Sequence, residues 1–162
     1  MRKRSRWFLG FVVAAGLLAT GAVANADDGK TVTLTTRLEG AQEVPPADPD
    51  AMGNAVLKID ASAGTVCFDA TFDRVGTPNR GHIHKAPAGV NGPIVVPFFE
   101  LRPGDAPVTD PRHDALERGR IKDCVTADPA LLADIVAHPD AYYVNVHNTR
   151  FPGGAFRCQL DR

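Results

Sequence analysis

The sequence predicts an all-β domain: a single antiparallel β-sandwich, immunoglobulin-like or Greek-key in type, with about seven or eight strands and one short helix. The 162 residues include 15 glycines and 13 prolines, a composition that favours turns and short strands over long helices. Several segments alternate apolar and polar residues, as strands with one buried face do. The length suits one domain, and no internal repeat or linker divides the chain.

The expected strands follow one another with turn signals between them. In Thr31–Glu39, for example, Val32 and Leu34 share one face and polar residues occupy the other. The proline-rich segments Val44–Asp50 and Arg102–His113 are expected to be loops. The remaining strands are predicted at Gly53–Asp60, Thr65–Asp73, Gly81–His84, Pro93–Phe98, Glu117–Val125, Ala141–His147 and Ala155–Leu160.

One segment, Pro129–Ala137, has the features of a helix. Asp128 can cap its first turn, and Pro129 suits the first helical position. His138 and Pro139 then end it. Its apolar face comprises Leu131, Leu132, Ile135 and Val136.

Residues 1–26 have the layout of a secretory signal peptide. Four basic residues lie within the first six positions, and the uncharged stretch Trp7–Ala24 follows. Ala24-Asn25-Ala26 then offers a small-x-small cleavage site. We therefore expect a secreted or cell-envelope protein, exported through the general secretion route. An uncleaved anchor is the alternative, because the apolar stretch is about long enough to span a bilayer.

Cleavage after residue 26 would leave a mildly acidic mature chain, residues 27–162, with a single domain at residues 31–162. Loss of the four basic residues takes the formal net charge from −1 to −5. Nucleic-acid binding is not expected, because it needs a clustered basic face and no run of Lys and Arg remains. No membrane span is expected after cleavage.

Strand parity suggests a pairing for the three cysteines, which an oxidising compartment would allow to form a disulfide. Cys67 and Cys124 both lie on the polar faces of their predicted strands, whereas Cys158 shares a face with Phe156 and Leu160. We predict a Cys67–Cys124 disulfide and a buried free thiol at Cys158. Three reduced cysteines are the alternative if the compartment is less oxidising.

Most catalytic signatures are missing from the sequence. After the predicted cleavage site the only serine is Ser62, in a predicted turn, and there is no G-x-S-x-G. Neither G-x-G-x-x-G nor a P-loop is present to bind a nucleotide cofactor. The sequence therefore predicts a non-enzymatic protein with no assigned catalytic residue or cofactor.

Histidine gives the strongest chemical signal. His82 and His84 lie on one face of a predicted strand, about 6.5–7 Å apart at Cβ. His147 lies on the non-core face of another strand, so all three rings would converge if these strands were neighbours. Three neutral imidazoles with an open position suit zinc or copper. The alternative is that these histidines hydrogen-bond to loops and hold no metal.

Five ordered segments together resemble the CHRD domain, a module first described in chordin, over nearly all of residues 31–162. The segments are Leu38–Pro46 (LEGAQEVPP), Gly53–Ala55 (GNA), Gly81–Val95 (GHIHKAPAGVNGPIV), Tyr142–Asn148 (YYVNVHN) and Phe151–Leu160 (FPGGAFRCQL). The resemblance implies an extracellular β-sandwich without an established catalytic activity. It also implies an extracellular or cell-envelope partner, whose identity the sequence does not give.

Two details qualify the resemblance. Cys158 stands where the family pattern usually has glycine, which supports treating it as the odd thiol. His82-Ile83-His84 also resembles the H-x-H copper ligands of copper/zinc superoxide dismutases, but the rest of that ligand set is missing. Dismutase activity is therefore not expected. A non-enzymatic binding or structural role is the first expectation, and copper or zinc binding by His82, His84 and His147 is the alternative.

Overall fold

The computed structural model describes residues 31–101 and 111–161 and confirms an all-β, antiparallel fold. The predicted signal peptide lies outside the described residues. The strands are β1 (Val32–Glu39), β2 (Met52–Asp60), β3 (Thr65–Asp73), β4 (Pro78–Lys85), β5 (Ile94–Glu100), β6 (Arg120–Thr126), β7 (Tyr142–Asn148) and β8 (Phe156–Gln159). The helices are α1 (Pro111–Glu117) and α2 (Pro129–Ala137), with short 3-10 turns at Gly40–Gln42 and Pro139–Ala141.

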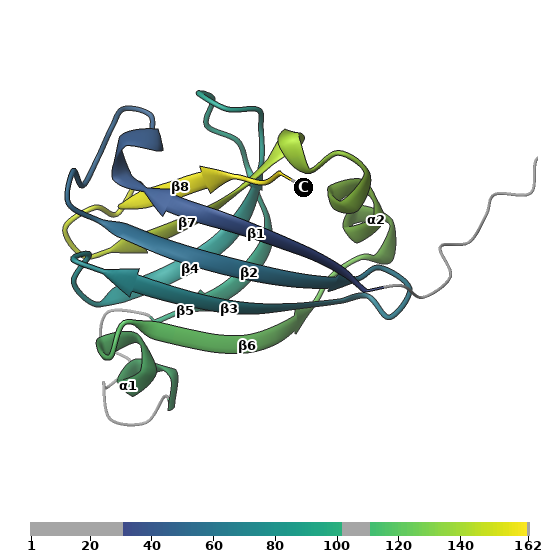
Figure 1. Ribbon diagram of the computed structural model, residues 1–162, viewed down its shortest axis with the longest axis horizontal. Coiled ribbons are helices and arrows are strands. Elements are labelled where there is room, and N and C mark those ends of the chain that lie inside the picture. Colours follow the sequence, from purple (N-terminus) through teal and green to yellow (C-terminus); the bar gives the residue numbers. More distant parts are fainter. Residues whose placement is uncertain (1–30, 102–110, 162) are drawn as a thin grey trace, which may run out of the picture.

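All eight strands belong to one curled sheet, in the order β5-β4-β7-β8-β1-β2-β3-β6. The curl places β1, β2, β3 and β6 in front of β4, β5 and β7, so the sheet is nearly a barrel (Figure 1). The last strand, β8, lies in the middle of the sheet and hydrogen-bonds to both β7 and β1. It therefore joins the two layers.

The core lies between the two layers and follows the period-2 pattern of the strands. On β2, Leu57 and Ile59 are fully buried, while the intervening Lys58 is exposed. Phe68 of β3 stacks on Phe98 of β5 with 4.4 Å between ring centroids. Aromatic and aliphatic side chains from both layers thus form one cluster, whose burial is the main source of the fold's stability.

The predicted helix is present with its predicted bounds and cap. The Asp128 carboxylate accepts from the backbone N–H groups of Ala130 and Leu131 at 2.7 and 3.2 Å. Leu132 and Ile135 are fully buried and anchor α2 to the core. His138 ends the helix, as expected for its position.

The segment Arg102–His113 was predicted to be a loop, and part of that prediction is wrong. Residues 102–110 lie outside the described residues, but α1 begins at Pro111. Proline is compatible with the first position of a helix, where its missing N–H costs nothing. Leu116 then becomes 1% exposed, and α1 ends before Gly119, whose φ of 71° closes the turn into β6.

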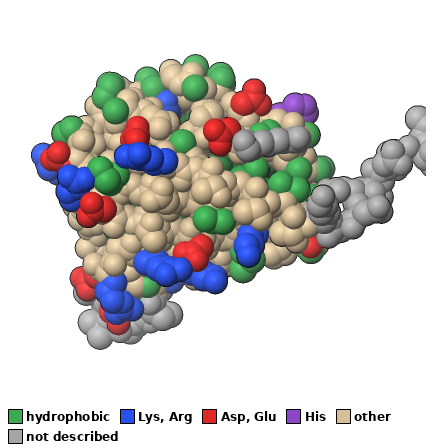
Figure 2. All heavy atoms as spheres, viewed as in Figure 1, with side chains coloured by type: hydrophobic (Ala, Val, Ile, Leu, Met, Phe, Trp, Pro, Cys, Tyr) green, Lys and Arg blue, Asp and Glu red, His purple; other side chains and the backbone are tan. Residues whose placement is uncertain are grey.

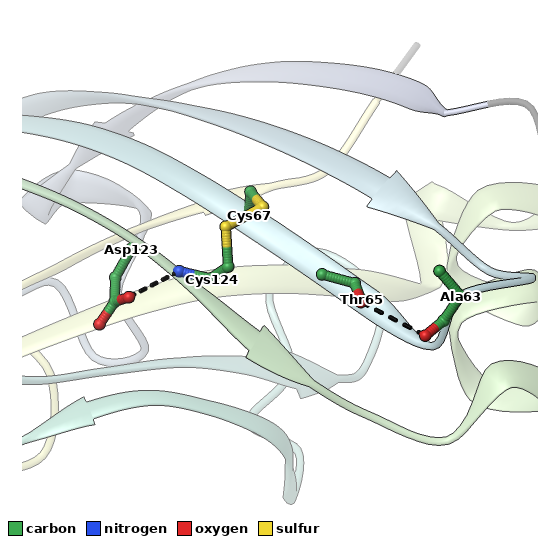
Figure 3. Close-up of a disulfide and its surroundings, with 5 residues drawn as sticks. All are labelled: Ala63, Thr65, Cys67, Asp123 and Cys124. Carbon is green, nitrogen blue, oxygen red and sulfur yellow. Dashed lines mark hydrogen bonds between the residues drawn. A yellow bond between two sulfur atoms is a disulfide. The ribbon is translucent and has the colours of Figure 1, made fainter.

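The Cys67–Cys124 disulfide is confirmed. The two cysteines are register partners on β3 and β6, and their Cα atoms lie 3.9 Å apart (Figure 3). Cys158 is the free cysteine, as predicted, although it is half-buried at the edge of the core and not fully enclosed. Within the described residues, no helix has the length and hydropathy needed to cross a membrane.

Candidate metal centre

The three predicted histidines meet on the outward side of two neighbouring strands. His82 and His84 alternate with the core residue Ile83 on β4, and His147 lies on β7. Antiparallel pairing of β4 with β7 sets the three rings together, with one ring nitrogen from each within 4.8 Å of the others. The expectation that these histidines would converge is therefore met by the fold.

The outward side of β4, β7 and β8 is buried, which the sequence did not predict. His82, His84 and His147 are 4%, 7% and 6% exposed. Loops before β5 and after β7 lie over them, because Gly92 and Pro152 contact the histidine rings. We call this the covered face, and its outward side chains are His82, His84, Tyr143, Asn145, His147 and Arg157.

Two of the rings hydrogen-bond to loop carbonyls, and each uses only one nitrogen to do so. His84 Nδ1 lies 2.9 Å from the Gly92 carbonyl oxygen, and His147 Nδ1 lies 3.1 Å from that of Pro152. A carbonyl can only accept, so each Nδ1 carries the proton and each Nε2 keeps its lone pair. Carbonyl bonds of this kind orient imidazoles that ligate metals through the other nitrogen.

The free nitrogens have little else to bind. His84 Nε2 is buried and has no hydrogen-bond partner. His147 Nε2 lies 3.2 Å from His82 Nδ1, so a His82 N–H donates to it in the absence of a metal. An unpartnered buried acceptor such as His84 Nε2 costs about 1–3 kcal/mol, which a bound cation would recover.

The spacing of the nitrogens is close to that of a metal site. Zinc–imidazole bonds of 2.0–2.1 Å in a tetrahedron place ligand nitrogens about 3.3 Å apart. The His82–His147 separation of 3.2 Å already matches that value. The third nitrogen lies within the 4.8 Å limit of the cluster and needs a modest inward movement.

Burial keeps the three rings neutral, which is the form that ligates metals. Desolvation lowers the pKa of His82 to about 4, with further lowering by the neighbouring His147, His84 and Arg80 charges. Desolvation likewise lowers the pKa of His147 to about 4 against the opposing Pro152 hydrogen bond. The pKa of His84 is also lowered, again mainly by burial. Protons therefore compete weakly with a metal at neutral pH.

Aromatic stacking holds the His84 ring of the cluster in place. The Tyr143 ring stacks on His84, with centroids 4.9 Å apart and planes at 13°. The Arg157 guanidinium lies 4.6 Å from the centroid of the same Tyr143 ring. The Tyr143 hydroxyl accepts the Gly92 N–H at 3.1 Å, which holds the loop whose carbonyl orients His84.

Sequence reasoning missed the polar residues around the histidines. Among the described residues, five buried side-chain atoms lack a hydrogen-bond partner, and three of them belong to His84, Asn145 and Arg157 of the covered face. A fourth belongs to Glu43, on a loop that contacts Arg157 through the neighbouring Gln42. Glu43 and Arg157 lie in segments that resemble the CHRD domain, but no pattern marked either as buried, because charged residues are usually exposed.

The comparisons with known proteins identify the family. The model of the CHRD domain matches residues 34–160, which include every strand except the first two residues of β1. No curated protein and no solved structure matches the chain. The match spans all three histidines and both disulfide cysteines. The chain therefore belongs to the CHRD domain family.

Proposed function

We propose that this protein is an exported, non-enzymatic CHRD-domain protein that binds copper or zinc through His82, His84 and His147. The observation that carries the proposal is the convergence of three buried ring nitrogens within 4.8 Å. Two of these rings are oriented by loop carbonyls that leave Nε2 available. An all-imidazole set suits both metals, since neither thiolate nor carboxylate joins it.

The proposed role is binding by the three imidazoles of the cluster. Membership in the CHRD family supports a binding or structural role. The N-terminal sequence supports export, since the basic start, apolar run and small-residue site match a cleaved signal peptide. N-terminal sequencing of the protein released from cells tests export, and a mature chain that begins at Met1 would contradict it.

Metal content tests the site. We would purify the mature protein without a histidine tag and measure zinc and copper per chain before and after re-addition and desalting. Near-stoichiometric metal is expected in the wild type, and loss of it is expected in a His82→Ala/His84→Ala variant. Metal should also raise the thermal midpoint of the wild type, because a ligand at 100 times its Kd adds about 2.7 kcal/mol of stability.

His138→Ala is the matched control. His138 is exposed and hydrogen-bonds to Asp134 at the end of α2, away from the cluster, so its removal should leave the metal content unchanged. Circular dichroism and the intact Cys67–Cys124 disulfide would show that the double variant is folded. Absence of metal from the reloaded wild type would overturn the proposal and leave the histidines as hydrogen-bonding residues of the covered face.

A further inference from the structure

A second candidate site lies at a pocket formed by three segments that are far apart in the sequence. The pocket has a volume of about 380 Å³ and lies between the segment 43–47, Asn91 and the segment 150–154. Its wall is largely apolar, with contributions from Val44, Pro45, Pro46, Phe151 and Pro152. An acidic side chain, Glu43, also lines it. An apolar wall beside an acid suits a ligand with a hydrocarbon body and a polar end.

Glu43 is an unusual residue for such a position. It is 5% exposed, and its Oε1 atom has no hydrogen-bond partner. The backbone of Gly154 makes room for it, because a Cβ at that position would lie 2.6 Å from Oε1. Gly154 also has a φ of +140°, a backbone conformation that residues other than glycine rarely adopt. The fold thus places a carboxyl group at the pocket and leaves its Oε1 atom without a hydrogen-bond partner.

The nearby arginine does not satisfy Glu43 either. Arg157 donates from Nε to the Gln42 carbonyl at 2.6 Å, and from Nη1 to the Val90 carbonyl and to Asn91 Oδ1. None of these hydrogen bonds reaches Glu43. Burial raises the pKa of Glu43 to about 7, although the Arg157 charge and the Val44 N–H act in the opposite direction. Among the residues that the structure describes, no lysine or arginine side chain forms an ion pair with the Glu43 carboxyl group.

We propose that this pocket binds an alkylammonium group, with its hydrocarbon stem against the proline and Phe151 wall and its N–H groups on the Glu43 carboxylate. Primary amines combine a flexible apolar stem with a compact charge that has three donors, which matches both parts of the pocket. The group could belong to a free amine or to a lysine side chain of a partner. The inference stands apart from the histidine cluster and does not rest on metal binding.

The experiment compares three ligands of similar size by NMR titration of the wild-type protein at pH 8, following the amide signals of Gly153 and Gly154. n-Butylamine should bind at least tenfold more tightly than n-butanol or butyrate. Equal binding of butanol would show an apolar pocket without a role for Glu43. Tighter binding of butyrate would assign the pocket to anions, with Arg150 at its rim. Either result overturns the proposal.

Glu43→Gln keeps the size of the side chain and removes its charge, so it should weaken butylamine binding at least tenfold. Glu100→Gln makes the same chemical change at an exposed position on β5 and should leave binding unchanged. If the Glu43→Gln variant fails to fold, the ranking of the three ligands on the wild type still decides the proposal. Unchanged butylamine binding by a folded Glu43→Gln variant would contradict it.

A pair of peptides distinguishes the two sources of the amine. Acetyl-Gly-Lys-Gly-amide should bind more tightly than its norleucine counterpart, and equal binding of the two peptides would contradict a role for the ammonium group. If the lysine peptide binds more tightly than butylamine, the pocket is suited to a lysine of a partner chain. If butylamine binds more tightly, the pocket is suited to a free amine. Both results support the alkylammonium assignment.

Discussion

The outward side of the sheet has two regions built from the same alternating pattern but with opposite surroundings. The covered face of β4, β7 and β8 buries three histidines and an arginine beneath loops. The outward side of β2, β3 and β6, which we call the open face, faces solvent, and Figure 2 shows side chains of both charges spread over it. Strand periodicity therefore determines which side of the sheet a residue occupies, whereas the loops determine whether that side is exposed to solvent.

The two faces use different interactions to stabilise the fold. On the open face, Arg120 pairs with Asp69 at 2.8 Å, and the exposed guanidinium is well hydrated. The Cys67–Cys124 disulfide joins β3 to β6 on the same face. On the covered face, polar groups are held by backbone carbonyls of the loops, as at Arg157 and His84. Solvent can replace a lost interaction on the open face but cannot reach most of the covered face.

The largest effect should come from the covalent link of the open face. The disulfide spans a sequence separation of 57 residues. The chain-entropy model then predicts a loss of about 4 kcal/mol for a Cys67→Ala/Cys124→Ala variant. Guanidinium chloride unfolding would measure it, with Cys158→Ser as the control of smaller effect. A loss in the double variant no greater than that of the control would show that the open face does not depend on this link.

Removal of one arginine from each face tests the comparison directly. Arg157→Met should cost about 3 kcal/mol, because Arg157 is 3% exposed and the variant loses its hydrogen bonds to the Gln42 carbonyl and the Asn91 side chain. Arg120→Met should change stability little, because water can hydrogen-bond to the Asp69 carboxylate in place of Arg120. Urea unfolding of both variants gives the two values. Similar losses in the two variants would mean that the loops do not seal the covered face.

The pH dependence of a Glu43→Gln variant sharpens the comparison further. The folded-state pKa of Glu43, about 7, lies above the ordinary value of 4.5 for a glutamate side chain. Its contribution to stability is therefore fully present below pH 4.5 and is lost as the pH rises through 7. The variant should be more stable than the wild type by about 2–3 kcal/mol at pH 8 and equally stable near pH 4.

Unfolding of both proteins across this pH range checks the prediction. The histidines act in the opposite sense, because pKa values lowered to about 4 give stability that is lost as the pH falls below 6.5. Both proteins share that slope, so it cancels in the difference between them. A difference that does not change with pH would show that Glu43 is solvated.

The smallest effect concerns the loop that orients His84. Tyr143→Phe removes the hydroxyl that accepts the Gly92 N–H and should cost about 1 kcal/mol of stability. If the cluster binds zinc, the variant should also lose about tenfold in zinc affinity, as changes to groups that orient metal ligands do. Competition with a chromophoric chelator would measure the affinity. Unchanged affinity would mean that Gly92 stays in place without the hydroxyl.

The sequence predicted the structure well wherever the alternation of side chains along a strand determines which face each one occupies. Val66, Phe68 and Phe72 point inward because they alternate with polar neighbours, and the same parity placed Cys67 opposite Cys124. Helix α2 was predictable from Asp128 and Pro129, since capping depends on local geometry alone. The same alternation placed the three histidines on the non-core side of their strands, although it could not show that these strands are neighbours.

The rest depends on contacts between segments that are distant in the sequence. Burial of Glu43 requires the loop after β7 to present a glycine at position 154. Burial of Arg157 requires carbonyls from two different loops, at Gln42 and Val90. Neither arrangement leaves a local pattern, so two charged residues that look solvent-exposed in the sequence are only 5% and 3% exposed in the fold.

The central place of β8 has a consequence for how the chain folds. Its four residues lie far from β1 in the sequence, yet they join β7 to β1 in the middle of the sheet. Sequence-local pairing can form the β1–β2–β3 meander early, but the barrel-like closure must wait for β8 to reach β1. Such long-range pairing slows folding. Closure of the sheet would thus be a late step of folding, because it needs the pairing of Glu39 with Arg157 across most of the described chain.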